Sequence, residues 1–500
     1  MTDATDPSRL TLPFEDVSSN DVPRVGGKAA NLGSLTRAGI PVPQGYCVST
    51  AAFDRFMSAL GDADGHFARL DALDGTDAAA ARGAAESMRA ALEALSLPDE
   101  VADAIRVGWR TLGTEFPLAV RSSATAEDLP GASFAGQQDT FLNIQGESAL
   151  LDAVRRCFIS LFTDRAVLYR ARGGFGHRGV RLAVVVQRLV DPEVSGILFT
   201  ADPISGHRGV VSIDAGFGLG EALVGGLISA DLYRVDRRQR TIVEATPGDK
   251  AFAIRSMPGG GTRQEPLSEA LRGARTLDDP QVLALVDIAE RVEVLYGVVP
   301  QDIEGCIAAG KIHVLQARPI TSLFPVPDAE GQGDGPRVYL SFGHIQMMTD
   351  AMPRLAREIW RYFFPVGRGG PRRPGDAAQT SRFMVAAGSR LYLDATIPLR
   401  VPRARRVMLG VLGHVYEELS LTASMLVSRP EFARVKAPMR GIVAAAARTI
   451  GPVVRRAPAV LLLGDPSRRA ARVDRELNEF VAAARARIGG APTPGGRVRQ

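Results

Sequence analysis

The chain has 500 residues and a net charge of +5, and 45% of its residues are hydrophobic. This size predicts two to four domains with buried cores, and the composition is that of a soluble globular protein. The first twenty residues are polar, and the longest apolar runs, such as residues 457–463, are far too short to span a bilayer. We therefore expect neither a signal peptide nor a membrane span, and a cytoplasmic location.

Cysteine, lysine and charge are unevenly distributed. Three widely spaced cysteines fit a reducing compartment and exclude a Cys-only zinc site. Only four lysines occur, so arginine supplies most of the positive charge. Residues 401–500 hold 18 Arg and Lys against 7 Asp and Glu, on Ala-rich sequence with few aromatics. This pattern favours a solvated helical face, or a surface for an acidic partner, over nucleic-acid binding.

The first 112 residues read mainly as helices. A Gly26-Gly27-Lys28 turn precedes an apolar stripe over residues 29–38, which predicts a helix that Gly39 and Pro41 end. An alanine-rich helical stretch with Gly and Asp breaks follows over residues 51–112.

From residue 118 to about 314 the pattern alternates between strands and helices. Residues 182–190 and 209–215 read as buried strands, and residues 311–317 alternate as a half-buried strand. Residues 322–338 are rich in Pro, Gly and Asp and predict a linker. Beyond it the sequence predicts mostly helix, over residues 350–364, 407–427, 430–454 and 467–488.

Residues 116–144 carry the strongest chemical signal. A strand-like run ends at Arg121 and two serines, an acidic pair follows, and then come small residues up to Gly136, with Thr140 four positions later. An arginine beside a small-residue loop can cradle a triphosphate, since free backbone amides and a guanidinium both bind phosphate oxygens. The stretch is not a P-loop, because no G-x-x-x-x-G-K-S/T pattern occurs.

Three further blocks, residues 26–49, 195–235 and 301–320, complete an ordered set of four. The set resembles the N-terminal ATP-binding domain shared by phosphoenolpyruvate synthase, pyruvate phosphate dikinase and rifampin phosphotransferase, which belongs to the ATP-grasp superfamily. It covers about the first two thirds of the chain. The resemblance implies an α+β fold in which ATP lies between two lobes.

Residue roles at the phosphate side follow from this resemblance. Lys28 would contact the triphosphate, although its local sequence alone also fits a surface lysine. Arg121 would bind phosphate, with Gly136 and Thr140 contributing; a plain strand residue is the alternative for Thr140. Gln187 would lie by the adenine, unless it is only a polar residue at a strand edge.

Glu304 and Gln316 form the predicted metal side, because a carboxylate and an amide oxygen suit Mg²⁺. Arg318 has the same strand parity as Gln316 and could neutralise charge on a transferred phosphoryl group. A surface charge cluster is the alternative for this set. Asp302 is a weaker metal candidate, and Glu221, in the glycine-rich stretch 216–226, is a weak candidate for the site.

The resembling enzymes split ATP into AMP and phosphate and pass the β-phosphoryl through a histidine in a T-x-G-G-x-x-S/T-H pattern. None of the six histidines here has that setting; His177, in GGFGH, has the wrong spacing and no preceding threonine. We therefore expect the phosphohistidine domain to be absent from this chain, and a separate chain to supply it if the reaction occurs.

The sequence after residue 338 resembles the start of the helical substrate domain of rifampin phosphotransferase. Gln346, Met347 and Met348 would give it a soft apolar surface for a rifamycin-like acceptor, with ordinary core methionines as the alternative. We predict an ATP-grasp domain over residues 1–322, a linker over 323–337 and a partial helical substrate domain over 338–500. Two other functions stay open: a phosphoenolpyruvate synthase-like enzyme using pyruvate, and a non-catalytic ATP-binding module or truncated remnant.

Overall fold

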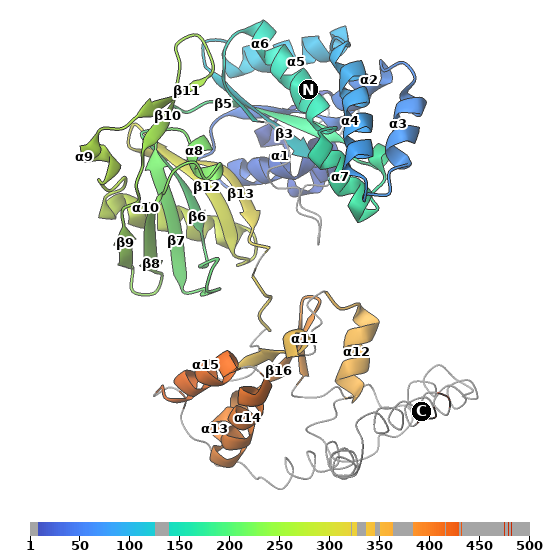
Figure 1. The fold of residues 1–500 in the computed structure, drawn as a ribbon. Coiled ribbons are helices and arrows are strands. Elements are labelled where there is room, and N and C mark those ends of the chain that lie inside the picture. The colour runs from blue at the N-terminus through green and yellow to red at the C-terminus, as the bar shows by residue number, and fades with distance from the viewer. Residues whose placement is uncertain are drawn as a thin grey trace. The chain divides into compact units, whose positions relative to one another are not determined.

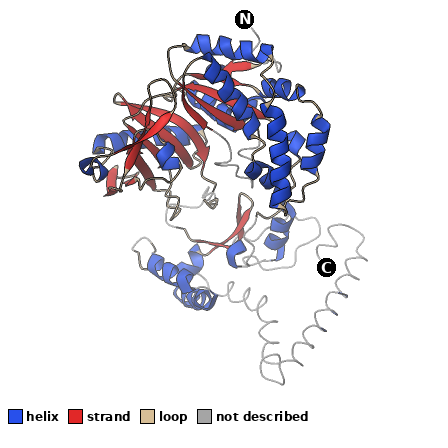
Figure 2. Cartoon of the chain, turned by 45° about the horizontal axis from the view of Figure 1, so that its top comes forward, coloured by secondary structure: helices blue, strands red, loops and turns tan. Residues whose placement is uncertain are grey.

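The computed structural model describes residues 9–125, 140–321, 323–327, 337–345, 351–363, 384–415 and 417–429, with the single positions 432, 475, 479 and 482. By its internal contacts the chain divides into two compact units, Met1–Leu323 and Phe324–Gln500. Helix and strand are mixed in both (Figure 1, Figure 2). None of the helices in the described ranges combines the length and apolarity that crossing a bilayer takes.

The first unit opens with a five-stranded antiparallel sheet in the order β1-β2-β5-β3-β4. Its strands are β1 (Thr11–Pro13), β2 (Gly45–Val48), β3 (Leu118–Ala124), β4 (Thr140–Ile144) and β5 (Leu182–Arg188). The helices of this lobe are α1 (Val22–Arg37), α2 (Thr50–Ser58), α3 (Ala63–Asp71), α4 (Ala78–Glu93), α5 (Asp99–Leu112), α6 (Glu147–Ser160) and α7 (Asp164–Gly173).

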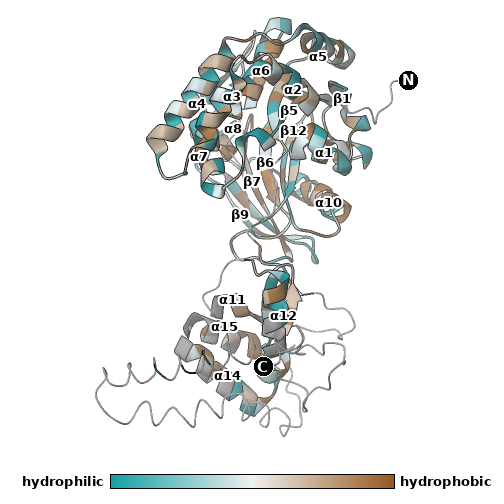
Figure 3. Cartoon of the chain, turned by 90° about the vertical axis from the view of Figure 1, so that its right-hand side faces the viewer, coloured by the Kyte–Doolittle hydropathy of each residue, from teal (hydrophilic) through white to brown (hydrophobic). Residues whose placement is uncertain are grey.

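Helices cover both faces of this sheet, which explains why β5 is a continuous apolar run. Ala183 and Val185 pack with Val25 and Leu32 of the α1 segment. The alternate residues of β5 enter a separate core with α2 and α6, where Phe158 stacks near Phe56 at a ring-centroid distance of 5.7 Å. A strand buried on both faces needs apolar side chains at every position. Figure 3 shows the mixture of apolar and polar residues along the covering helices.

The rest of the first unit is built on a six-stranded antiparallel sheet in the order β13-β12-β6-β7-β8-β9. These strands are β6 (Val194–Phe199), β7 (Val210–Phe217), β8 (Asp231–Asp236), β9 (Thr241–Thr246), β12 (Gln301–Ala308) and β13 (Lys311–Pro319). The remaining elements are α8 (Glu221–Val224), the hairpin β10 (Phe252–Ser256) and β11 (Thr262–Pro266), α9 (Glu269–Arg272) and α10 (Asp279–Leu295).

Helix α10 closes one face of the second sheet. A capping box between Asp278 and Gln281 starts the helix, so backbone donors at its first turn are satisfied. Val282, Val286 and Ala289 of its buried side pack in one core with the apolar residues of the sheet. The strands and helix predicted over residues 182–190, 209–215, 311–317 and 29–38 are confirmed, with ends shifted by a few residues.

The prediction of a mostly helical second unit is incomplete. Its described part also contains a three-stranded sheet in the order β14-β16-β15. The strands are β14 (Tyr339–Ser341), β15 (Met384–Ala387) and β16 (Arg390–Asp394). Its helices are α11 (Phe342–Ile345), α12 (Arg354–Phe363), α13 (Thr396–Arg400), α14 (Pro402–Val415) and α15 (Glu417–Val427). A tight turn at Gly388, whose φ is +55°, joins β15 and β16.

Two small cores hold this unit. Leu340, Leu399 and Leu412 belong to one, and Phe342 and Met384 to the other. Helices predicted over residues 350–364 and 407–427 are present as α12, α14 and α15. Those predicted over residues 430–454 and 467–488 lie outside the described residues, except for single positions. The role of this unit as a substrate domain stays a prediction.

Candidate functional site

A pocket of about 640 Å³ lies in the first unit, lined by residues of both sheets. Seven of the predicted site residues line it together: Lys28, Arg121, Thr140, Gln187, Glu304, Gln316 and Arg318. Gly136, Gln346, Met347 and Met348 lie outside the described residues. Residues far apart in the sequence thus meet in one pocket, which argues against a mere surface charge cluster for the group at β12 and β13.

Lys28 lines the pocket from the first turn of the regular part of α1, and the backbone conformation of Gly26 sets where that part begins. Gly26 has φ +72° and ψ 169°, a conformation essentially restricted to glycine, and it kinks the α1 segment so that regular helix begins just before Lys28. The Ser123 hydroxyl accepts a hydrogen bond from the Ala29 amide at 3.1 Å and donates to the Val25 carbonyl at 2.8 Å. The Lys28 ammonium donates to the Ser122 carbonyl at 2.8 Å. This anchoring fixes Lys28 against the end of β3.

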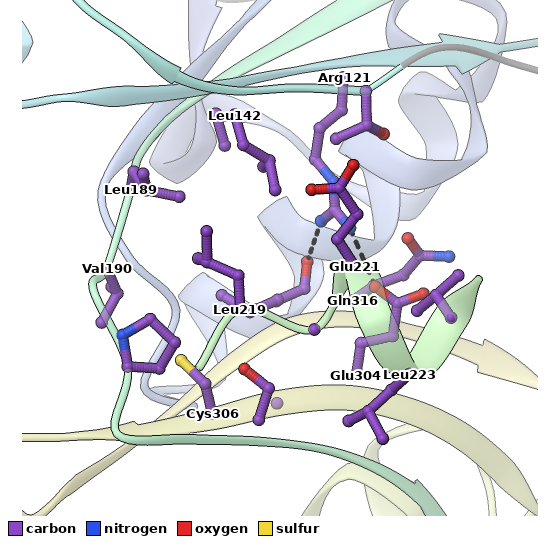
Figure 4. A pocket seen from close by; sticks show the side chains of 18 of the residues that line it. Arg121, Leu142, Leu189, Val190, Leu219, Glu221, Leu223, Glu304, Cys306 and Gln316 are labelled. Carbon is purple, nitrogen blue, oxygen red and sulfur yellow. Dashed lines mark hydrogen bonds and ion pairs between the residues drawn. The ribbon is translucent and has the colours of Figure 1, made fainter. Parts of the chain in front are cut away.

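Arg121 links the two lobes. From β3 it donates through Nη2 to Glu304 Oε2 on β12 at 2.9 Å, and through Nη1 to the Leu315 carbonyl on β13 at 3.0 Å. Figure 4 shows Arg121 pointing across the pocket toward Glu304 and Gln316. Thr140 lies opposite Arg121 in the β3–β4 register, which puts its side chain beside the same wall. The two side chains of the ion pair are only 13% and 20% exposed, so water screens the pair weakly.

The pairing of β12 with β13 arranges the predicted metal-side residues. Glu304 lies opposite Gln316, and Asp302 lies opposite Arg318. Residues two apart on a strand share a face, so all four project to one side of the sheet, as their parity predicts. Arg318 donates to Asp302 Oδ2 through Nε at 2.9 Å and lies within 2.8 Å of it through Nη2. Burial raises the pKa of the Asp302 carboxyl above its usual value, and the negative charge of Glu304 raises it further. The charge and hydrogen bond of Arg318 act in the opposite direction.

The other end of the pocket is apolar. Leu142, Leu189, Val190 and Leu219 line it, along with Cys306, whose thiol pKa burial raises to about 12 (Figure 4). Gln187 lies on β5, two residues before Leu189 and opposite Ala119 of β3. It is 2% exposed and donates through Nε2 to the Pro43 carbonyl at 3.1 Å. Sequence reasoning missed these apolar residues, because a short apolar run looks the same whether it lines a pocket or a core.

Positive charge dominates the lining. It includes Lys28, Arg121, Arg188 and Arg318 against Glu221 and Glu304. The Arg188 guanidinium is held elsewhere, because it donates to the Leu112 carbonyl and stacks over Phe116 with a 3.8 Å separation from the ring centroid. The other three cations, Lys28, Arg121 and Arg318, outnumber the two lining carboxylates, and a pocket of this sign favours an anion.

The weak candidate Glu221 does reach the pocket. It begins α8, three residues after Gly218, and accepts a hydrogen bond from the Thr262 hydroxyl at 3.4 Å. Gly218 has φ +78°, and a Cβ there would lie 2.4 Å from the Ile254 carbonyl oxygen. The glycine-rich stretch is therefore a close-packed wall of the pocket, held by the β10 segment.

His177, singled out by its GGFGH setting, is not among the residues lining the pocket. It is buried, and its Nδ1 accepts a hydrogen bond from Arg170 Nε at 3.2 Å. Burial, reinforced by the Arg170 charge, lowers its pKa to about 4. It is a neutral structural residue, in agreement with its exclusion as a phosphocarrier.

Comparison with known proteins identifies the domain. Residues 22–330 match the model for "Pyruvate phosphate dikinase, AMP/ATP-binding domain". The chain belongs to this family. The match covers both lobes of the pocket, so the family's AMP/ATP-binding domain contains every described residue predicted for the nucleotide site.

Curated relatives include two differently named groups. A rifampicin phosphotransferase of a Streptomyces species is 46% identical over 406 residues, which are 81% of this chain and 44% of that protein. A rifampicin phosphotransferase of Bacillus subtilis is 41% identical over 426 residues, which are 85% of this chain and 47% of that protein. A probable phosphoenolpyruvate synthase of Archaeoglobus fulgidus is 44% identical over 316 residues, 62% of this chain and 42% of that protein. The chain therefore spans less than half the length of the curated relatives it matches.

Proposed function

We propose that the first unit is an ATP-grasp domain that binds ATP and Mg²⁺ for a dikinase-type phosphotransfer. The observation that carries this proposal is the convergence of Lys28, Arg121 and Arg318 with Glu304 and Gln316 in one pocket, inside a domain of an AMP/ATP-binding family. Three cations suit a triphosphate, and the apolar end beside Gln187 suits the adenine ring.

Magnesium would bind at Glu304 and Gln316. Both residues offer oxygen donors, lie opposite each other on adjacent strands, and line the pocket. Among the described residues there is no group of three or more His, Cys, Asp and Glu that could hold a metal alone. Magnesium at sites of this kind keeps several waters and takes phosphate oxygens as ligands, so two protein oxygens fit it. An ion held by Glu304 and Gln316 would supply positive charge that offsets the charge of the phosphates.

The residues of the chain would act by position and charge. Lys28 and Arg121 would hold the triphosphate, and Arg318 would neutralise negative charge on the transferred phosphoryl group. The β-phosphoryl would go first to the histidine of a phosphohistidine motif and then to an acceptor, while the γ-phosphoryl would leave as phosphate. The balanced reaction consumes ATP, water and acceptor, and gives AMP, phosphate and phosphorylated acceptor.

A rifamycin-like acceptor is favoured by the extent of similarity. The matches to rifampicin phosphotransferases run over 406 and 426 residues, while the first unit has only 323, so they include part of the second unit. The match to the phosphoenolpyruvate synthase named above runs over 316 residues. Pyruvate is the second candidate acceptor, because that synthase is almost as similar in identity.

Product analysis tests this proposal. The purified chain is incubated with ATP and Mg²⁺, with rifampin, with pyruvate or with neither, and AMP and phosphorylated acceptor are quantified. We expect saturable ATP binding and no AMP until a protein carrying the phosphohistidine motif is added. AMP and phosphorylated rifampin from the chain alone would show that it holds its own phosphocarrier. Absence of ATP binding would refute the proposal.

A further inference from the structure

The ion pair between Arg121 and Glu304 implies a selectivity that goes beyond nucleotide binding. We propose that Glu304 makes the pocket discriminate against metal-free ATP, by competing with phosphate for the Arg121 guanidinium until a divalent cation neutralises the carboxylate. The inference rests on the proposed function and concerns which form of the nucleotide the pocket accepts.

The first observation is that Arg121 is already engaged on the opposite lobe. Its Nη2 bonds Glu304 at 2.9 Å and its Nη1 bonds the Leu315 carbonyl at 3.0 Å, from strands of the other sheet. Its Nε is buried and has no hydrogen-bond partner among the described residues. A phosphate that binds this guanidinium therefore either displaces Glu304 or lies beside its carboxylate.

The second observation concerns the surroundings of that carboxylate. The Glu304 side chain is 20% exposed and forms an ion pair with Arg121. Losing that partner to phosphate would leave a partly buried negative charge next to a polyanion. Like charges at such short range repel strongly where water is scarce. Metal-free ATP therefore cannot satisfy both Arg121 and Glu304.

A divalent cation removes this conflict. Gln316 lies directly opposite Glu304, so an amide oxygen and a carboxylate oxygen face the same space. A cation there would take the place of Arg121 as the partner of Glu304, and Arg121 would be released to phosphate. The neighbouring pair, Arg318 and Asp302, lies within the same sheet and keeps its own contact at 2.8 Å. Of these two pairs, the one between Arg121 and Glu304 joins a proposed phosphate ligand to a proposed metal ligand across the two sheets.

Isothermal titration of the full chain with ATP, in excess EDTA and in excess MgCl₂, tests the inference. The wild-type protein should bind the magnesium complex about 100-fold more tightly than metal-free ATP. Glu304→Gln keeps the shape and removes the charge, so it should tighten metal-free ATP about tenfold and weaken the magnesium complex. The matched control is Glu147→Gln, which removes a carboxylate held 2.7 Å from Arg106 outside the pocket lining and should change neither value.

If Glu304→Gln does not fold, titrations of the wild-type protein can still contradict the inference. Adenosine carries no phosphate, so its dissociation constant should be the same with and without Mg²⁺. Equal affinity of the wild type for both forms of ATP, or no gain for metal-free ATP in a folded Glu304→Gln, would overturn the inference while leaving nucleotide binding intact. No ATP binding in either buffer would instead overturn the proposed function, and this inference with it.

Discussion

Gly26 lies against Ser123 so closely that a Cβ on the glycine would lie 2.2 Å from the serine carbonyl oxygen and 2.4 Å from its hydroxyl. The same serine caps the helix that carries Lys28, through its bond with the Ala29 amide. One contact between the start of α1 and the end of β3 therefore sets both the backbone conformation and the place of the lysine.

Gly26→Ala should destabilise the first unit and weaken ATP binding. The substitution combines a glycine-only backbone conformation with a clash against backbone atoms, and we expect a loss of roughly 3 kcal/mol in the free energy of unfolding. Displacement of Lys28 should weaken ATP binding at least about tenfold. Urea denaturation and titration calorimetry measure the two effects.

Gly39→Ala is the matched control for this prediction. Gly39 also has a positive φ, +70°, but a Cβ there would meet nothing within 4 Å. It should cost only the conformational strain, roughly 1 kcal/mol, and leave ATP affinity unchanged. If the two variants behaved alike, contact with Ser123 would not be what anchors the lysine.

Arg318→Ala should abolish nucleotide turnover and leave the fold intact. Arg318 lies at the end of β13 with a side chain 37% exposed, outside the cores, so its loss removes little packing. Loss of a charge that stabilises the transferred phosphoryl group should lower turnover at least about 100-fold. Turnover is followed as AMP formed in the complete reaction, and circular dichroism checks the fold.

The control for that variant is Arg272→Ala, which removes an arginine paired with Asp249 on an exposed surface. It should leave both turnover and fold as in the parent. Parental turnover by Arg318→Ala would show that the assignment of Arg318 to the phosphoryl group is wrong.

The sequence predicted single site residues but not their pairing. Lys28 follows two glycines and Arg121 ends an apolar run, but both were predicted as site residues through the family resemblance, because local sequence alone also fits a surface lysine. Arg121 and Glu304 are 183 positions apart and meet because two sheets face each other. The periodicity of apolar residues along the chain carries no information about such a contact. The parity of Gln316 and Arg318 did predict a shared face, since register within a hairpin is a local property.

In the second unit, the sequence predicted the helices but not the short strands. Its helices α12, α14 and α15 could be predicted from periodicity, whereas β15 and β16 were missed. These strands have four and five residues, too few for an alternating pattern to be recognised. The turn at Gly388 was the signal that could have found them.

His177 should make the stability of the first unit depend on pH. Its pKa is about 4, against 6.5 for a free histidine, because burial and the Arg170 charge disfavour the protonated ring, while Asp71 opposes them weakly. The unfolded chain then binds more protons between pH 6.5 and pH 4. Stability from this residue is therefore complete above pH 6.5 and is lost as the pH falls toward 4, by roughly 2–3 kcal/mol.

Urea denaturation of the wild type and of His177→Gln across this range isolates the contribution. Glutamine can still accept the hydrogen bond from Arg170 but does not titrate. The difference in unfolding free energy between the two proteins should change with pH between 6.5 and 4 and be constant above pH 7. A constant difference throughout would mean that His177 is protonated in the folded protein as easily as in the unfolded chain.

The buried ion pair of Asp231 and Lys250 should be strongly coupled. Both side chains are almost fully buried, and Asp231 also accepts from the Gly248 amide at 2.8 Å and the Thr276 amide at 2.7 Å. Lys250→Met removes the cation and leaves a buried carboxylate, which should cost roughly 3 kcal/mol of unfolding free energy. Asp231→Asn should cost a similar amount, because it leaves the ammonium without its counter-ion.

The double variant decides whether the two effects share one cause. With both charges gone, no uncompensated ion stays buried, so Lys250→Met with Asp231→Asn should be more stable than the sum of the single losses predicts, by at least about 1 kcal/mol. Urea denaturation of the four proteins gives this coupling energy. Additive losses would mean that each residue stabilises the β8 region separately, through packing and backbone hydrogen bonds rather than through the ion pair.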